Sequence, residues 1–96
     1  MRLVESKFAA WLRSKPPTEI VGENRDCHAC PIALFYKEAS GCEVVIFGDG
    51  YGDYIIDRGY DKRAVPNWAA DFIRTVDGDT GDGKITATRA LEALAA

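Results

Sequence analysis

The sequence predicts an α+β fold in which four short helices pack on a central β-hairpin. Two observations predict it: four segments repeat apolar residues with the helical period, and two short β-branched runs flank a glycine-rich turn. The length of 96 residues fits one domain and not two. An apolar fraction of 47% is sufficient to bury one core without disulfides or a metal. We therefore expect residues 1–96 to form a single compact α+β domain.

Four amphipathic segments are expected to be helices, and residues at their ends support this. Pro16 ends the first helix, because proline cannot donate a helical hydrogen bond. Pro31 suits the first turn of the second helix, and Gly41 suits its C-terminal end. Pro66 opens the third helix, and Thr86 can cap the N-terminus of the fourth. The expected helices span residues 3–14, 31–40, 66–76 and 86–95.

The change from helical to β-type patterning falls in the middle of the chain. Two short runs of β-branched and aromatic residues predict strands over residues 43–48 and 53–58. The glycines between them can take the positive φ angles that a tight turn requires. Because an isolated hairpin is only marginally stable, the helices are expected to cover one of its faces. Residues 17–30 and 77–83 are expected to be loops.

Charge and hydropathy exclude several classes of partner. The net charge of −3 argues against direct nucleic-acid binding, since phosphate contacts need a surplus of Lys and Arg. No apolar run approaches the roughly 20 residues of a membrane span, so no membrane partner is expected. Residues 1–5 contain an acid and no apolar signal region, which predicts a cytoplasmic protein.

The three cysteines are the first candidates for metal or redox chemistry. Cys27 and Cys30 form a C-x-x-C motif that could hold half of a zinc site, with His28 and Cys42 as further ligands. If residues 31–40 are helical, however, Cys30 and Cys42 lie roughly 18 Å apart at 1.5 Å per residue. In a redox site, the helix N-terminus would favour a thiolate at Cys30. A zinc-binding or thiol-redox protein using Cys27 and Cys30 is therefore the alternative hypothesis. The preferred interpretation includes no metal and no cofactor.

The acidic loop before the last helix is similar in part to an EF-hand calcium loop. One register places Asp82 and Gly83 at loop positions 5 and 6, and an apolar residue at position 8. The same register places Gly78 at position 1, where a ligand is required, and Arg89 at position 12, where the motif has Glu. A register that begins at Asp77 also lacks ligands. A solvated interhelical turn is the simpler interpretation, and calcium binding stays open.

Catalytic patterns are sparse. His28 is the only histidine, and no nucleophile or orienting acid is placed beside it by the sequence. The glycine-rich residues 48–52 lack the Gly-Lys-Ser/Thr ending of a phosphate-binding loop. We therefore expect a protein that is not an enzyme, with no catalytic residues.

Binding to another protein is the function that the composition favours. Residues 49–82 carry eight Asp against four basic residues, a local charge of −4. Within this segment tyrosines alternate with aspartates, and Trp11 and Trp68 add more large aromatic residues than a small core requires. Aromatic residues rimmed by charge are typical of protein interfaces.

We therefore predict a small non-enzymatic protein-binding module that acts through an acidic-aromatic hairpin on a basic partner surface. It would be an adaptor or an inhibitor, a class that includes phage-encoded proteins. The alternative is that Tyr54 and Ile56 face the core while the aspartates only solvate the other face. The predicted partner-binding residues are Asp49, Tyr51, Asp53, Tyr54, Asp57, Tyr60 and Asp61.

Overall fold

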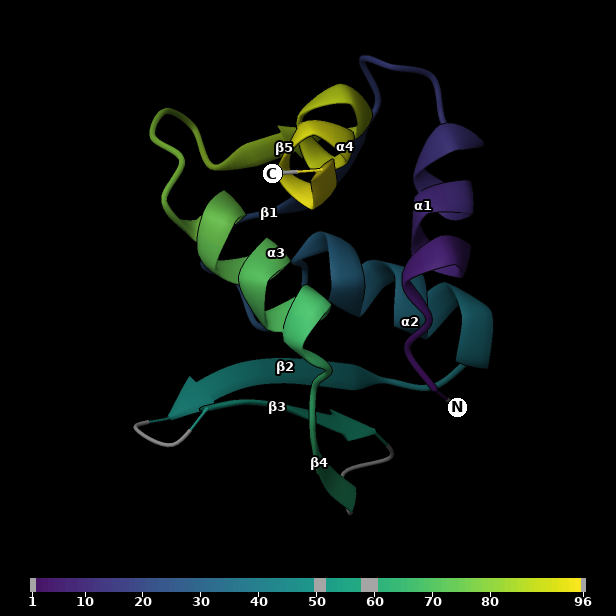
Figure 1. The fold of residues 1–96 in the computed structure, drawn as a ribbon, viewed down its shortest axis with the longest axis vertical. Coiled ribbons are helices and arrows are strands. Elements are labelled where there is room, and N and C mark those ends of the chain that lie inside the picture. The colour runs from purple at the N-terminus through teal and green to yellow at the C-terminus, as the bar shows by residue number, and fades with distance from the viewer. Residues whose placement is uncertain (1, 50–51, 58–60, 96) are drawn as a thin grey trace.

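The computed structural model describes the backbone of residues 2–49, 52–57 and 61–95, and within this part the side chains of residues 47–49, 52–54, 57, 61 and 62 are left undescribed. The chain has the predicted α+β fold, with four helices in the described residues (Figure 1). Each helix begins and ends within two residues of its predicted bounds. The helices are α1 (Glu5–Arg13), α2 (Pro31–Ser40), α3 (Asn67–Asp77) and α4 (Ala87–Ala95).

The strands form two small antiparallel sheets. The predicted hairpin is present, but it is joined by a third strand in the order β2-β3-β4. A second sheet pairs β1 with β5, two segments that are 60 residues apart and lie outside the predicted strands. The strands are β1 (Ile20–Glu23), β2 (Val44–Asp49), β3 (Gly52–Asp57), β4 (Asp61–Ala64) and β5 (Lys84–Thr86).

The sequence had suggested a central hairpin. In the structure, the hairpin lies at one end of the molecule. Figure 1 shows the β2-β3-β4 sheet at the bottom, α2 and α3 above it, and α4 with the β1-β5 pair at the top. The small β1-β5 pair lies near α4, because it joins the segment that follows α1 to the segment that follows α3. The helices consequently pack as much on one another as on the larger sheet.

One cluster of buried side chains connects all the helices. Phe8 of α1 lies at its centre and contacts the rings of Phe35, Phe72, Trp11 and Trp68 at centroid separations of 5.1–6.0 Å. The two tryptophans pack against this core and are only partly exposed. The expectation that they are surplus aromatic residues was therefore wrong, because three helices, α1, α2 and α3, meet at one phenylalanine and need large rings to fill the space between them.

The register of the larger sheet decides which of its faces is buried. Ile46 and Ile55 are paired across β2 and β3, and both are buried beneath the helices. The neighbouring pair, Val45 and Ile56, is only half-buried, since successive residues of a strand point to opposite faces. The alternative in which Ile56 faces the core is therefore wrong. Ile55 takes that place instead.

A close approach of β1 to the start of α2 fixes the loop between them. The N–H of Glu23 donates to the carbonyl of Ala29 over 2.8 Å. At Gly22 an added Cβ would lie 2.6 Å from the nitrogen of Pro31, so only glycine fits there. This contact places residues 26–30 at the junction of β1, α2 and the larger sheet.

The helices of the described residues are short, and α3 is the longest of them with 11 residues. None reaches the length and apolarity that a helix needs to cross a lipid bilayer.

Candidate functional site

The predicted partner-binding residues map onto the β2-β3-β4 sheet. Asp49 is the last residue of β2, and Asp61 is the first residue of β4. Three more residues lie on β3, namely Asp53, Tyr54 and Asp57. The side chains of these five residues, and all of Tyr51 and Tyr60, lie outside the described part of the structure. The hairpin site therefore stays a prediction.

The cysteines are separated as the predicted helix requires. Cys30 is the residue that precedes α2, and Cys42 follows Gly41, whose left-handed φ of 72° ends the helix. Because α2 runs between them, the two thiols lie at its opposite ends and cannot share one metal ion. Within the described residues, all three cysteines are free thiols.

Burial determines the chemistry of Cys30. Its side chain is 4% exposed, and this burial raises the pKa of its thiol to about 11. The backbone N–H groups of Ala33 and Ile32, at the start of α2, lower this pKa, but the effect of burial is larger. The expectation of a thiolate at this helix N-terminus was therefore wrong, and the Cys30 thiol is protonated at neutral pH.

A different group of potential metal ligands lies just before α2. Asp26, Cys27 and His28 each offer one ligand atom, and these atoms all lie within 4.8 Å of one another. The Sγ of Cys27 is 3.3 Å from the Nδ1 of His28. Among the described residues this is the one such group of three acidic, thiol or imidazole side chains. Sequence analysis missed Asp26 because it lies outside the C-x-x-C spacing, although an acid beside the motif was visible.

The acidic loop between α3 and β5 is held by protein contacts. Arg89 donates two hydrogen bonds to the carboxylate of Asp79, at 2.7 and 2.8 Å. The other two acids accept backbone N–H groups, from Arg25 at Asp77 and from Lys84 at Asp82. The guanidinium of Arg89 thus supplies the positive charge that a calcium ion would bring to such a loop.

Asn24 anchors this loop to the end of β1. Its side-chain amide donates to the carbonyls of Val76 and Asp79, each over 3.0 Å, and its backbone N–H donates to Gly83. Asn24 is buried, and its Oδ1 accepts no hydrogen bond within the described residues. At Gly83 an added Cβ would lie 2.9 Å from this oxygen, and φ is 83°, so the position requires glycine. These hydrogen bonds hold residues 77–83 as an ordered turn between α3 and β5.

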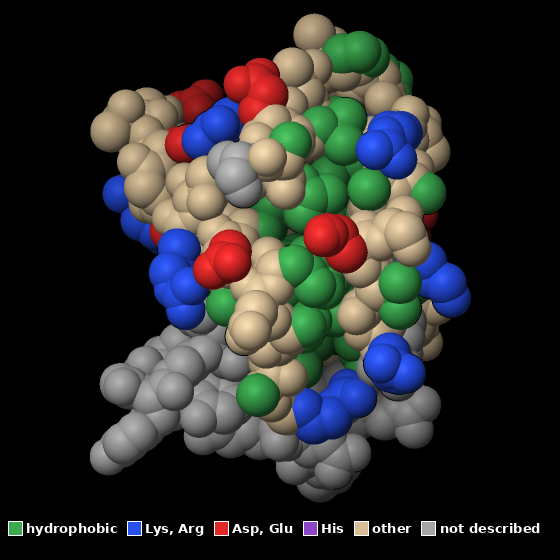
Figure 2. Space-filling model, viewed as in Figure 1, with side chains coloured by type: hydrophobic (Ala, Val, Ile, Leu, Met, Phe, Trp, Pro, Cys, Tyr) green, Lys and Arg blue, Asp and Glu red, His purple; other side chains and the backbone are tan. Residues whose placement is uncertain are grey.

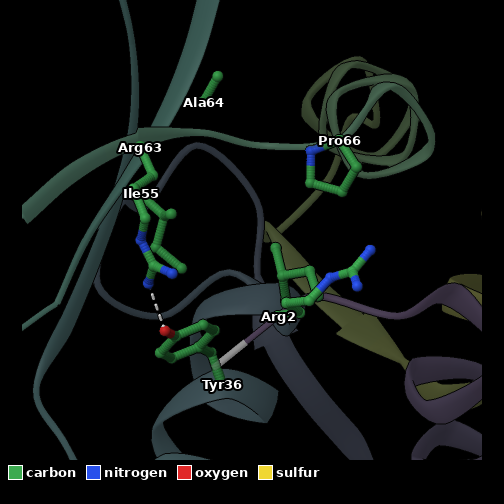
Figure 3. Close-up of a pocket in the computed structure, with 7 residues that line it drawn as sticks. Arg2, Tyr36, Ile55, Arg63, Ala64 and Pro66 are labelled. Atoms are coloured by element: carbon green, nitrogen blue, oxygen red, sulfur yellow. Dashed lines mark hydrogen bonds between the residues drawn. The ribbon is translucent and has the colours of Figure 1, made fainter.

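A pocket of about 260 Å³ lies between the N-terminal segment, α2 and the β3-β4 pair (Figure 3). The buried side chain of Tyr36 forms part of its wall, and its hydroxyl accepts a hydrogen bond of 2.6 Å from Arg63. Arg2 extends away from this hydroxyl and towards Pro66 (Figure 3). The two guanidinium groups therefore do not converge on one point, as a bidentate anion site would need.

A shallower and larger groove of about 490 Å³ lies between α1 and α4. Ala9, Leu91 and Leu94 contribute apolar surface, and Glu5 and Arg13 lie at its rim. Figure 2 shows apolar side chains gathered along the middle of this face of the molecule.

Three places thus offer chemistry or contact surface: the β2-β3-β4 sheet, the Asp26–His28 group and the α1-α4 groove. No protein-family model, curated protein or solved structure matches this chain. The choice between these places depends on the charges and exposures of their own residues.

Proposed function

We propose that this chain is a small non-enzymatic protein-binding module, an adaptor or inhibitor, whose contact surface is the β2-β3-β4 sheet. The observation that carries the proposal is the one-sided cover of this sheet. The helices pack on the face that holds Ile46 and Ile55, and the opposite face leaves Val45 and Ile56 partly exposed side by side. Adjacent β-branched side chains on an open sheet face are suitable for burial against another protein.

The backbone of the sheet supports recognition through its face and not through its β2 edge. β3 is hydrogen-bonded on both sides, to β2 and to β4. On the outer edge of β2, the N–H of Ile46 donates to the carbonyl of Cys27 over 2.8 Å. A partner strand could not pair with β2 at this position, so we place the contact on the sheet face.

The charge of the segment supports a basic partner. Residues 49–61 contain four aspartates and one arginine, a local charge of −3, and Lys62 and Arg63 of β4 reduce the net charge of residues 44–64 to −1. Acidic residues near an apolar patch accelerate association with a basic surface and disfavour acidic competitors. A basic protein is therefore the partner that we propose for this surface, with nucleic acid repelled by the same charges.

Charge introduced on the open face of the sheet tests the proposal. The tagged chain, immobilised and exposed to a lysate of its native cells, is compared with the double variant Val45→Lys, Ile56→Lys, whose two residues lie side by side on that face. A matched control, Asp71→Lys, changes the net charge equally at an exposed position on α3. We expect the hairpin variant to lose at least tenfold of the specifically captured protein, since juxtaposed like charges cost several kcal/mol. The control should retain the capture.

A variant of the α1-α4 groove shows whether the loss of capture is specific to the sheet. Leu94→Gln changes the α1-α4 groove and leaves the sheet untouched. Equal capture by the wild type and the hairpin variant would contradict the proposal. Loss of capture by Leu94→Gln alone would move the contact to the groove and would also contradict it. Circular dichroism of each variant shows that the comparison is made between folded chains.

A further inference from the structure

We infer that Asp26, Cys27 and His28 form a binding site for a divalent transition-metal ion of the zinc type. The inference rests on the proximity of a carboxylate, a thiol and an imidazole whose ligand atoms lie within 4.8 Å of one another. It is independent of the protein-binding function proposed above. It also differs from the zinc hypothesis based on the sequence, which combined Cys27 and His28 with the buried Cys30 and with Cys42.

The separations suit one ion. Zinc binds thiolate sulfur at about 2.3 Å and imidazole nitrogen at about 2.0–2.1 Å, so two such ligands at tetrahedral angles lie roughly 3.4–3.6 Å apart. The Cys27 Sγ and the His28 Nδ1 are already 3.3 Å apart. The ligand oxygen of Asp26 lies within 4.8 Å of both atoms.

The backbone of this loop is held in place by its neighbours. One carboxylate oxygen of Asp26 accepts the N–H groups of His28 and Ala29, at 2.9 and 3.2 Å. The carbonyl of Asp26 accepts the N–H of Cys30, and the carbonyl of Cys27 accepts the N–H of Ile46. The loop is thereby tied to α2 and to β2, which limits the reorganisation that metal binding would cost. The second carboxylate oxygen of Asp26 makes no hydrogen bond within the described residues.

The ligand set selects the class of ion. A thiolate with an imidazole favours zinc and similar transition metals over magnesium and calcium, which prefer oxygen ligands. Three protein ligands leave a fourth position of a tetrahedral ion open to water or to an external ligand. His28 is exposed, so such a ligand could approach from solvent.

Cobalt titration tests the site directly. Co²⁺ is added to the reduced full-length chain, and the absorption of the thiolate-to-cobalt transition is followed, with Zn²⁺ then added in competition. We expect one equivalent of Co²⁺ to saturate the signal and Zn²⁺ to remove it. The variants Cys27→Ala and His28→Ala should each weaken binding at least tenfold, and Asp26→Asn should weaken it less.

Cys42→Ala is the matched control, because Cys42 is also a half-buried cysteine but lies beyond the far end of α2. It should bind cobalt as the wild type does. The inference is overturned if ten equivalents of Co²⁺ give no thiolate signal. It is equally overturned if the signal survives in Cys27→Ala, or if it depends on Cys42. Circular dichroism of the apo variants distinguishes a lost ligand from a lost fold.

Discussion

Three cysteines of the same chain have different environments, and this difference determines which of them can react. Cys27 and Cys42 are half-buried, whereas Cys30 is buried between the end of the 26–30 loop and α2. A raised pKa, from 9.0 to about 11, lowers the thiolate fraction of Cys30 at pH 8 by about a hundredfold. Sequence alone placed Cys30 at a helix N-terminus but could not show how deeply the side chain is buried there.

Thiol labelling of the native protein should therefore modify two cysteines quickly and the third only on unfolding. In the double variant Cys27→Ala, Cys42→Ala, we expect the remaining Cys30 to label at least a hundredfold more slowly than in urea. Colourimetric disulfide exchange at pH 8 measures both rates. Rapid labelling of Cys30 in the folded double variant would contradict its burial.

The Asp79–Arg89 pair should contribute stability that depends on pH. The two hydrogen bonds from Arg89 lower the pKa of the Asp79 carboxyl below its ordinary value of 3.8. A carboxyl with a lowered folded-state pKa stabilises the fold above the unfolded-state pKa, and this stabilisation is lost as the pH falls through the folded-state value. The relevant window therefore lies below about pH 4.

Urea unfolding at pH 7 and pH 3 tests this pair. Since both side chains are partly exposed, we expect Asp79→Asn to lower the free energy of unfolding at pH 7 by about 1 kcal/mol. The difference between variant and wild type should shrink at pH 3, because the Asp79 carboxyl of the unfolded wild type is then largely protonated and folding must release that proton. A difference that is the same at both pH values would show that the charge of Asp79 is not responsible.

At the scale of elements, the close packing of β1 against α2 requires a residue without a side chain, Gly22. The Cβ of an alanine at position 22 would meet backbone atoms of Ala29 and Pro31 at 2.6–2.7 Å, and backbone cannot move aside as a flexible side chain can. We expect Gly22→Ala to lower the free energy of unfolding by about 1–3 kcal/mol, as overpacking does.

Gly78→Ala is the matched control for this substitution. Gly78 has an ordinary φ of −79°, and an added Cβ there would lie 3.5 Å from its nearest neighbour. Thermal unfolding of the two variants should show a lower midpoint for Gly22→Ala only. Equal midpoints would mean that β1 and α2 are not packed as closely as described.

The helices were predictable from sequence, and the small strands were not, for a physical reason. Each helix carries an apolar stripe, and a proline or glycine lies at or near an end of each of the first three, so these patterns are local. β1 and β5 contain only four and three residues, and their pairing joins positions 61–66 residues apart. β4 includes an acid and two basic residues and lacks an apolar run. Such strands are specified by long-range packing and not by their own sequence.

The candidate sites, too, could be predicted only in part from the sequence. Cys27 and His28 were visible as potential ligands, but the third ligand, Asp26, became evident only from the turn that its carboxylate makes with His28 and Ala29. The hairpin was predicted within one residue at each bound, but the face on which Ile56 lies was not. An alternating pattern indicates two faces and does not say which one the helices cover.

At the scale of the whole molecule, the larger sheet forms one end and the α1-α4 groove lies on the helical part (Figures 1 and 2). The single core cluster joins these parts, so a partner could use either surface without unfolding the other. The sheet combines a partly exposed apolar pair with a segment, residues 44–64, whose net charge is −1, whereas Glu5 and Arg13 at the rim of the groove balance one another. This contrast favours the sheet as the surface for a basic partner.

Methyl-group nuclear magnetic resonance separates these two surfaces most directly. The captured partner is titrated into the chain labelled at its Ile, Leu and Val methyl groups, and the shift of each signal is followed. If the sheet is the contact surface, the signals of Val45 and Ile56 shift on binding while those of Leu91 and Leu94 stay in place. Shifts confined to Leu91 and Leu94 would contradict the assignment of the β2-β3-β4 sheet as the binding surface.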